Sequence, residues 1–307
     1  RGLQIDVVRC VAGTSAGRPR LRRKTRRVRR LQHSHRQVPA ERVVLLTGDR
    51  RGVDRHAILD VDAAGHHQVG VAADAARTAF GREVPGAKVV AENAPVVADA
   101  DVVILAVKPQ QMQSVLAEIR GTLRPDALVV SIAAGVTLGS LAAGLASGQR
   151  IVRVMPNTPC LIGRGASGYS LGPHATPTDG QLVAQLLSAV GMAHEVPEGQ
   201  LDAVTGLSGS GPAFVYTMIE QLAAGGVEMG LPTELAADLA ARTVAGAAEM
   251  VLTTGETPAV LRDRVTSPGG TTLAGLRALA NNGFERAVVE AVRAATHRSA
   301  ELGTSPT

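Results

Sequence analysis

Residues 267–272 combine glycines with hydroxyl side chains just before a predicted helix. The segment is Ser-Pro-Gly-Gly-Thr-Thr, and leucines follow it at helical spacing. Glycines let the backbone turn sharply, and a helix N-terminus offers N–H groups and the positive end of its dipole to an anion. The hydroxyls of Ser267, Thr271 and Thr272 both donate and accept hydrogen bonds. The segment therefore suits a small ligand with a carboxylate beside a ring nitrogen.

The same segment also fits an ordinary helix start. In that interpretation Thr271 is the N-cap, and Asn282-Gly283 ends the helix. N-caps are common and substrate loops are rare, so the segment alone does not decide between the two. Other parts of the chain have to decide it.

Small or rigid residues also follow three predicted strands. The strand at 102–107 leads into Lys108-Pro109-Gln110, and the next two lead into Ala133-Ala134-Gly135 and Pro156-Asn157-Thr158-Pro159. Each segment alone is compatible with a plain turn. In an open parallel sheet, however, ligands lie at the carboxyl ends of the strands, so the three together predict a cofactor cleft.

The elements that must position these residues change type at about residue 198. Short apolar strands alternate with Ala-rich helical stretches before that point, which is typical of α/β proteins, and only helices follow it. We expect a basic extension at 1–40, an α/β domain with a parallel sheet at 41–197 and an all-helical domain at 198–307. The predicted strands are 42–46, 69–72, 88–90, 102–107, 128–132, 151–155 and 194–196. The predicted helices are 200–229, 234–252, 257–264, 272–280 and 284–302.

The unbroken apolar run Val102–Ala106 predicts a strand that is covered on both faces. The glycine-rich segment 206–212 is similar to a phosphate loop, but such a loop should follow a strand. We interpret its glycines as close helix contacts in the second domain. We expect close helix approach also at Gly225, Gly226 and Gly230, at about 1 kcal/mol each relative to Ala.

The basic charge of the chain is concentrated at its N-terminus. Residues 1–55 hold 16 of the 32 Lys and Arg and 4 of the 27 Asp and Glu, so the remainder has 16 basic against 23 acidic residues. The body is therefore acidic, and we interpret the arginine-rich run at 22–30 as a solvated extension rather than a nucleic-acid arm. Aromatic residues make up 2% of the chain, which counts against single-stranded nucleic-acid binding.

The two cysteines, Cys10 and Cys160, could form one bridge, but neither has a neighbour at metal-ligand spacing. No apolar run reaches the roughly 18 residues of a membrane span, and no signal-peptide core is found at the N-terminus. We expect a reduced, soluble, cytoplasmic protein without a membrane partner.

The chain resembles the pyrroline-5-carboxylate reductase family in five motifs that occur in order. The resemblance extends from about residue 83 to the end of the chain. The motifs are Ala106-Val107-Lys108-Pro109-Gln110, Arg153-Val154-Met155-Pro156-Asn157-Thr158-Pro159, the run from Asp202 to Ala213, the run from Gly225 to Pro232, and Ser267 to Thr272.

The resemblance implies a Rossmann-like domain followed by a helical dimerisation domain that interlocks with a second subunit, as a dimer or a larger assembly of dimers. It implies NAD(P)H-dependent reduction of the cyclic imine 1-pyrroline-5-carboxylate to L-proline, the last step of proline biosynthesis. NADPH is the expected cofactor, with NADH as an alternative. The implied cofactor-binding residues are Gly48, Asn93, Ala106, Val107, Lys108, Pro109, Ile132, Ala133, Ala134, Asn157 and Thr158.

The resemblance also assigns the substrate site and the catalytic group. The implied substrate-binding residues are Ser267, Gly270, Thr271 and Thr272, and Thr272 is the catalytic residue that steers the ring nitrogen. A protonated imine is already electrophilic, so the site needs positioning more than a strong acid. We interpret His194 and Cys160 as packing residues. Arg264 stands where the family often has Asn, and an arginine could there meet a phosphate.

The family's Gly-rich nucleotide loop is missing after the first predicted strand. Thr47 to Arg55 contains no G-x-G-x-x-G, and Asp49 would repel a phosphate. A shift of one nucleotide across the codons of Gly48 to His56 permits Thr-Gly-Val-Gly-Ser-Ile-Gly. We therefore hypothesise a double frame slip there, with the family-like helix resuming at Ala57.

Three other functions are compatible with parts of the sequence. A catalytically inactive relative could persist as a dimeric interaction module, because the nucleotide loop is altered. A nucleic-acid-associated protein could use the arginine-rich arm, which salt-dependent DNA binding would reveal. A related reductase could act on another imine or on a hydroxy acid, although the helical domain has no lysine for hydroxy-acid chemistry.

Overall fold

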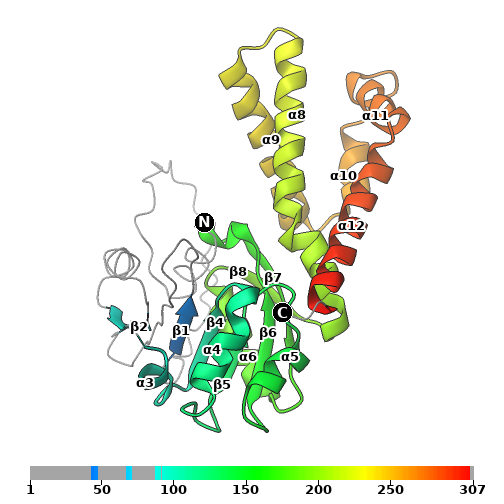
Figure 1. Cartoon of the computed structure of the whole chain (residues 1–307). Helices are drawn as coiled ribbons and strands as arrows, with labels where there is room; N and C mark the ends of the chain where they lie inside the picture. The colour runs from blue at the N-terminus through cyan, green and yellow to red at the C-terminus, as the bar shows by residue number, and fades with distance from the viewer. Residues whose placement is uncertain (1–42, 48–66, 71–86, 91, 305–307) are drawn as a thin grey trace. The chain divides into compact units, whose positions relative to one another are not determined.

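The computed structural model describes residues 43–47, 67–70, 87–90 and 92–304 (Figure 1). Its contacts define two compact units. The first contains the described residues up to Gly209 together with Arg298 onward, and the second contains Ser210–His297. The predicted basic extension, Cys10 and the loop at Gly48 lie outside the described residues. The predicted domain boundary at 197/198 stays a prediction.

An eight-stranded sheet forms the framework of the first unit, in the order β3-β2-β1-β4-β5-β6-β7-β8. The pairs from β3 to β6 are parallel, β7 is antiparallel to β6, and β8 is parallel to β7. The first six strands have the order of a doubly wound sheet, which reverses between β1 and β4. The strands are β1 (Val43–Thr47), β2 (His67–Gly70), β3 (Ala87–Val90), β4 (Val102–Ala106), β5 (Leu128–Ser131), β6 (Arg150–Met155), β7 (Gly165–Leu171) and β8 (Gly191–Glu195).

Within residues 92–304, helices and helical turns alternate with the strands of the first unit, and helices form most of the second unit. Those of the first unit are α3 (Ala94–Val97), α4 (Met112–Ile119), α5 (Leu138–Gly144), α6 (Pro177–Ser188) and α7 (Leu201–Val204), with the 3₁₀ turns η1 (Pro109–Gln111), η2 (Thr158–Ile162) and η3 (Glu198–Gln200) and the π-helical turn η4 (Thr205–Gly209). The others are α8 (Gly211–Glu228), α9 (Thr233–Thr254), α10 (Pro258–Arg264), α11 (Thr271–Asn281) and α12 (Phe284–Thr304), whose last residues belong to the first unit.

The predicted parallel sheet is present, but it contains one strand that was not predicted, β7, which runs antiparallel to β6. The sequence of β7, GASGYSL, has two glycines and no Val, Ile or Thr, so its own strand propensity is weak. Pairing with β6 on one side and β8 on the other holds it in the sheet. The seven predicted strands are present, with ends displaced by up to about three residues.

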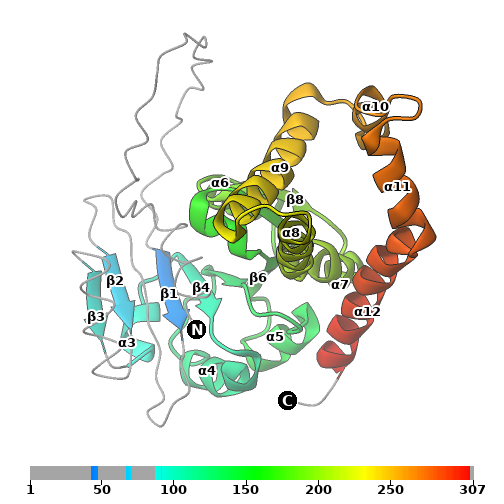
Figure 2. The ribbon, with the colours of Figure 1, turned by 90° about the horizontal axis from the view of Figure 1, so that it is seen from above.

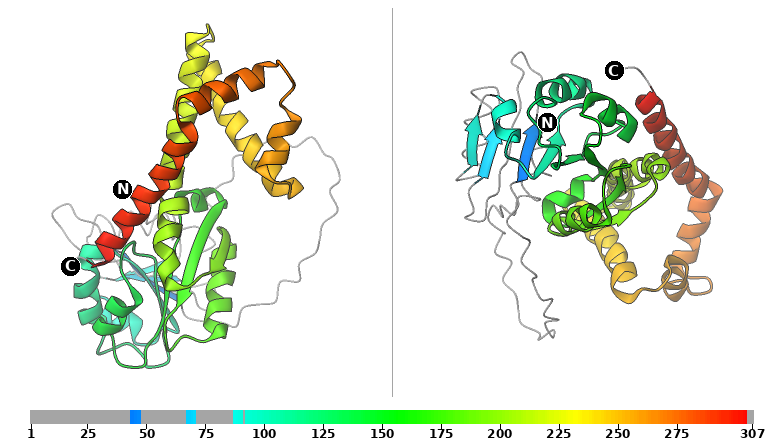
Figure 3. Two further views of the ribbon diagram at one scale, coloured as in Figure 1. Left: turned by 90° about the vertical axis from the view of Figure 1, so that its right-hand side faces the viewer. Right: turned by 90° about the horizontal axis from the view of Figure 1, so that it is seen from below.

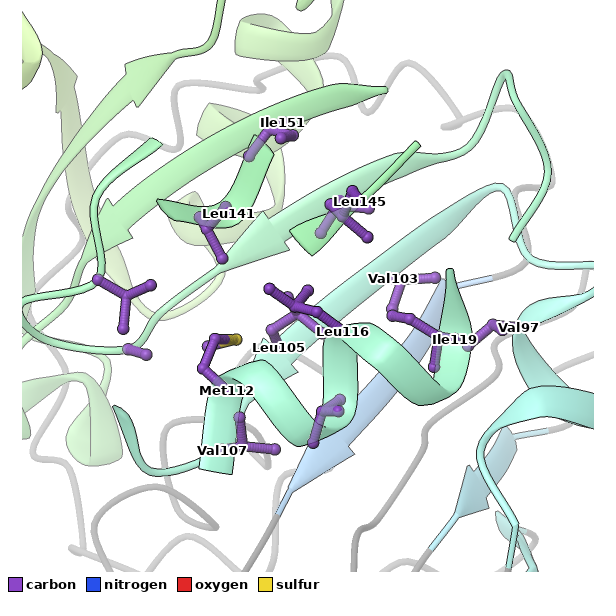
Figure 4. Close-up of a cluster of buried hydrophobic side chains, with 14 of the residues drawn as sticks. Val97, Val103, Leu105, Val107, Met112, Leu116, Ile119, Leu141, Leu145 and Ile151 are labelled. Carbon is purple, nitrogen blue, oxygen red and sulfur yellow. The ribbon is translucent and has the colours of Figure 1, made fainter. Parts of the chain in front are cut away.

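Strand β4 is buried on both faces, which confirms the prediction from its apolar run. Val103 and Leu105 belong to a cluster with side chains of α4 and α5, including Leu116 and Leu141 (Figure 4). Val102 and Ile104 belong to a second cluster that includes side chains of α6. The central sheet therefore lies between two helical layers.

The predicted helix at 200–229 is broken into α7, η4 and α8. Gly209 and Gly211 do not make the helix contacts predicted for them in the second domain, and the contact predicted for Gly206 stays a prediction. A Cβ on Gly209 would meet the side-chain methyl of Met155 in β6, and a Cβ on Gly211 would meet nothing within 4 Å. Gly209 thus lets the turn η4 lie close to Met155 of the sheet, within the first unit.

Helices α8 and α9 pack side by side in the second unit (Figure 3). A Cβ on Gly226 would lie 3.3 Å from the Cβ of Ala236, so this glycine does permit close helix approach. Gly225 faces open space, and Gly230 has a φ of 96° in the turn after α8, which only glycine adopts readily. One of the three predicted positions therefore has the predicted role.

The second unit buries very little of its apolar surface. Helices α8, α10 and α11 contain no buried residue, and α9 buries only Ala236 and Ala240. Side chains such as Leu222 and Met218 are 45% and 40% exposed. No helix within residues 92–304 is long and apolar enough to cross a membrane.

Candidate active site

The sheet brings the three predicted strand ends together. β4, β5 and β6 are parallel neighbours, so the segments after Ala106, Ser131 and Met155 lie along one edge. β1 lies on the other side of β4, with Thr47 opposite Ala106. Gly48 follows Thr47 outside the described residues, so its predicted role stays a prediction.

The segment after β4 offers its backbone rather than its first side chains. Ala106 and Val107 are fully buried, and Val107 belongs to the core under α4. Lys108 is extended, and its carbonyl accepts a hydrogen bond of 2.9 Å from the Gln111 N–H, so η1 begins at Pro109. The turn directs the chain away from the sheet at the point where a ligand would approach.

The loop after β5 is held at its start by the sheet. The Ile132 N–H donates to the Leu105 carbonyl at 3.0 Å, and the Ala133 N–H lies 3.4 Å from the Ser131 hydroxyl. Ala133 is buried, whereas Ala134 is exposed. Gly135 has a φ of 75° and makes a turn in the middle of the loop, which leads to Thr137, the N-cap of α5.

Asn157 joins three segments after β6. Its side-chain oxygen accepts a hydrogen bond of 2.9 Å from the Ala166 N–H of β7, and its Nδ2 donates to the Ser208 carbonyl at 3.1 Å. The side chain is buried, and these two bonds occupy its amide. Asn157 therefore fixes the shape of this strand end, and its predicted contact with the cofactor stays a prediction.

Thr158 has a buried hydroxyl with no hydrogen-bond partner in the structure. A buried polar atom without a partner costs about 1–3 kcal/mol, so native proteins rarely keep one without a reason. This hydroxyl lies directly after Asn157 at the edge shared by β4, β5 and β6. It is an enclosed donor and acceptor without a protein partner.

Asn93 is buried before α3, and its side chain is also engaged. Its Nδ2 donates to Glu118 Oε2 at 2.7 Å, and its backbone N–H donates to Glu118 Oε1 at 3.1 Å. Glu118 lies on α4, so the pair ties α3 to α4. The predicted cofactor contact of Asn93 stays a prediction.

In the second unit, the predicted substrate segment forms a turn and a helix start. The Gly270 N–H donates to the Ser267 carbonyl at 3.0 Å, and Gly269 has a φ of 72° after Pro268, as in a type II turn. A Cβ on Gly270 would clash with the Ser267 hydroxyl. The turn therefore requires glycine at 269, and a side chain at 270 would displace the Ser267 hydroxyl.

The structure corrects the predicted N-cap of this helix. The N-cap of α11 is Gly270, and Thr271 is the first helical residue. No side chain caps this end, so the N–H groups of Thr271, Thr272 and Leu273 have no acceptor within the helix. The turn thus presents three N–H groups beside exposed hydroxyls, which suits a carboxylate.

Arg264 lies just before this turn and is paired within its own unit. Its two terminal nitrogens each lie 2.5 Å from a carboxylate oxygen of Glu256, which precedes α10. The bidentate pair connects the two ends of α10. Arg264 therefore has a carboxylate partner in the position where the family often has Asn.

The two predicted packing residues have different outcomes. Cys160 is fully buried beside Val190, which confirms its interpretation. His194 is exposed on β8, so its interpretation as a packing residue is wrong. β8 lies at an end of the sheet, and alternation along an edge strand turns such a side chain outward.

Sequence reasoning missed a charged network around Arg153. This arginine is buried in β6, and Glu198 and Asp202 are its partners at 3.2 and 3.8 Å. The signal was present, because an arginine inside the apolar strand RIVRVM requires a buried partner. The acidic partners, however, lie 45 and 49 positions away, where no local pattern connects them.

Comparison with known proteins decides the family. A family model described as pyrroline-5-carboxylate reductase dimerisation matches residues 198–302, and one described as NADP oxidoreductase, coenzyme F420-dependent, matches residues 56–135. A pyrroline-5-carboxylate reductase of Methanosarcina acetivorans is 48% identical over 71% of this chain and 81% of its own length. One from Arabidopsis thaliana is 50% identical over 72% of this chain and 79% of its own length.

The chain belongs to the pyrroline-5-carboxylate reductase family. A solved structure agrees with this result. The pyrroline carboxylate reductase of Plasmodium falciparum, which has NADP bound, is 37% identical with a TM-score of 0.66, covering 71% of this chain and 83% of that one. In this family the Rossmann-like and helical parts predicted from sequence are both expected, and both are present.

Proposed function

We propose that the chain reduces 1-pyrroline-5-carboxylate to L-proline with a hydride from NADPH. Membership of the reductase family carries this proposal. The activity is the last step of proline biosynthesis and makes the chain an oxidoreductase that acts on a C–N bond. It fits both the strand-end cluster of the first unit and the hydroxyl-lined turn of the second.

The residues of the first unit fit a nicotinamide dinucleotide. The strand order reverses between β1 and β4, which is where dinucleotides bind in doubly wound sheets. The unpartnered Thr158 hydroxyl supplies a hydrogen-bonding group at the same edge. When bound, NADPH supplies the hydride. Lys108, the Ile132–Ala134 backbone and Thr158 would hold it, while the residues that distinguish NADPH from NADH follow β2 outside the described part.

The residues of the second unit fit the substrate. The N–H groups at the start of α11 and the hydroxyls of Ser267 and Thr271 would bind the carboxylate of the imine. The Thr272 hydroxyl would accept a hydrogen bond from the protonated ring nitrogen and orient it. Thr272 would thereby fix the face of the C=N bond that receives the hydride, a contribution of positioning rather than of acid strength.

The helical unit is a dimerisation domain, and its surface explains why it needs a partner. Helix α8 is apolar in composition yet buries none of its side chains. One groove of about 570 Å³ runs between α8 and α9, and another of about 610 Å³ is lined by Leu222 of α8 together with residues of α11 and α12 such as Leu279 and Phe284. Exposed apolar surface of this extent is typical of an obligate interface. A second copy of the chain would cover it.

The inactive alternative has no support among the described residues or the relatives. Its one argument is the altered loop after Gly48, which a replacement tests. If the segment from Gly48 to Arg55 hinders the cofactor, replacing it with Thr-Gly-Val-Gly-Ser-Ile-Gly should lower the KM for NADPH.

The function is tested by NADPH oxidation at 340 nm with the purified chain and 1-pyrroline-5-carboxylate. We expect turnover that saturates with both compounds, and proline in amounts equal to the NADPH consumed. Pyruvate, a 2-oxo acid whose reduction gives a hydroxy acid, is the control substrate, and it should cause no oxidation of NADPH. Oxidation with pyruvate but not with the imine would overturn the proposal.

A further inference from the structure

Within the first unit, the end of α12 lies beside α5 (Figure 2) and against the loop that follows β5. A Cβ on Gly303 would lie 3.2 Å from the Gly135 carbonyl oxygen and 3.6 Å from the Thr137 methyl carbon. A Cβ on Gly135 would lie 3.4 Å from the Cβ of Leu302. The 3.2 Å approach is tighter than most Cβ contacts, so Gly303 lets α12 pass close to the loop backbone, while Gly135 packs against Leu302.

A buried arginine fixes the same helix end from the other side. The Arg153 side chain is 5% exposed, and its Nη1 lies 3.2 Å from Glu198 Oε1 while its Nη2 lies 3.8 Å from Asp202 Oδ1. Asp202 Oδ1 accepts a hydrogen bond of 2.7 Å from the Ser299 hydroxyl of α12. Glu198 Oε1 accepts one of 2.6 Å from the Leu138 N–H. One guanidinium therefore connects α5 and α12.

These contacts surround the loop at residues 132–137. Its first N–H groups are held by β4 and Ser131, its end is held through Leu138, and its middle is covered by Leu302 and Gly303. A buried arginine whose carboxylate partners are also hydrogen-bonded has little freedom to move. The position of the loop is thus set by side chains distant in sequence.

We propose that Ser299 to Gly303 of α12, anchored through Asp202, Glu198 and Arg153, position the Ala133–Gly135 loop and thereby set the affinity for NADPH. The proposal rests on the proposed function, in which this loop contacts the cofactor. These residues act through the loop and are positioning residues. A stretch at the C-terminal end of the chain is thereby part of the dinucleotide site.

The first test is Gly303→Val, with Ala300→Val as the matched control. Ala300 lies on the same helix and is exposed, so its valine meets no loop. We expect Gly303→Val to raise the dissociation constant and the KM for NADPH by about fivefold or more, with the KM for the imine changed less than about twofold. The control should change neither value. NADPH binding is measured by fluorescence in the absence of imine.

Ser299→Ala is a second variant, in case Gly303→Val does not fold. It removes only the hydroxyl that reaches Asp202, and we expect weaker NADPH binding, which Ser299→Thr restores. Unchanged NADPH affinity in the folded variants would overturn the proposal, as would an equal rise in the KM for the imine. If the unaltered chain binds NADPH but does not reduce the imine, the proposed function fails while the binding comparison still decides the positioning role.

Discussion

At the scale of single residues, Thr158 offers the most direct test of the proposed cofactor site. Its buried hydroxyl is unpartnered, so Thr158→Val should remove a penalty and keep the shape of the side chain. We expect the free energy of unfolding without cofactor to rise by about 1 kcal/mol, while the dissociation constant for NADPH rises about tenfold. Urea unfolding and NADPH titration measure the two effects.

Thr122→Val is the control for this variant. Thr122 has its hydroxyl 3.1 Å from the Ile119 carbonyl at the end of α4, away from the strand ends. It should leave NADPH binding unchanged. A Thr158→Val chain that loses stability and binds NADPH normally would contradict the assignment, because the hydroxyl would then have a structural role.

Thr272 should matter for turnover and not for stability. Its side chain is half-buried in the first turn of α11 and makes no cap. We expect Thr272→Ala to lower kcat/KM for the imine by about tenfold to a hundredfold, the loss of one hydrogen bond to a charged group. Thr272→Ser should keep most of the activity. Steady-state kinetics with the imine measure kcat/KM for both variants. Equal losses of kcat/KM in Thr272→Ala and Thr272→Ser would show that the hydroxyl has no role in the reaction.

At the scale of elements, strand pairing makes one tyrosine sensitive to pH. Tyr169 of β7 is paired in register with Glu195 of β8. Burial raises the pKa of the Tyr169 hydroxyl above its ordinary value, and the negative charge and hydrogen bond of Glu195 raise it further. The folded state therefore favours the neutral phenol more than the unfolded chain does.

The sign of the pH effect follows from this rise. The stabilising contribution is complete below the unfolded pKa of about 10 and is lost as the pH increases through the higher folded pKa. The free energy of unfolding of Tyr169→Phe should therefore fall less at alkaline pH than that of the unaltered chain. Urea unfolding between pH 8 and 11 tests it, and parallel stability curves for the two proteins would exclude this tyrosine as the cause.

The elements that sequence reasoning found are those with strong local signals. The apolar run of β4 and the leucine spacing of α11 predict their own structure, and both are present. β7 was missed because its strand state comes from pairing on both sides rather than from its residues. The break at η4 was missed for a similar reason, since Gly209 is required by contact with Met155 rather than by the helix pattern.

The same division holds for the candidate site. Ala106, Ser131 and Met155 could be placed at one edge from sequence, because parallel neighbours end together. The hydrogen bonds of Asn157 and the network of Arg153 could not, since they join residues distant in sequence. Local patterns predict where a ligand lies, and tertiary contacts decide which atoms remain free to bind it.

At the scale of the whole molecule, the exposed face of α8 predicts self-association. Leu222 is 45% exposed in an apolar groove with Leu279 and Phe284. Leu222→Glu would place a charge in the interface, and desolvating an unpaired charge is expensive. We expect the unaltered chain to be at least a dimer by light scattering. In the variant, the dissociation constant of the dimer should be about tenfold higher.

Gln221→Glu is the matched control for the interface. It adds the same charge at the preceding position of the helix, and Gln221 does not line the groove that contains Leu222. It should leave the mass unchanged. If both variants keep the assembly of the unaltered chain, this groove is not the contact between copies.

The most direct test of the central claim follows the hydride. The purified chain is incubated with 1-pyrroline-5-carboxylate and with NADPH that carries deuterium at the transferable position of its nicotinamide, and the product is analysed by mass spectrometry. We predict proline with one deuterium on the carbon that was double-bonded to nitrogen. A folded, self-associated chain that consumes no NADPH, or that releases proline without deuterium, would contradict the assignment.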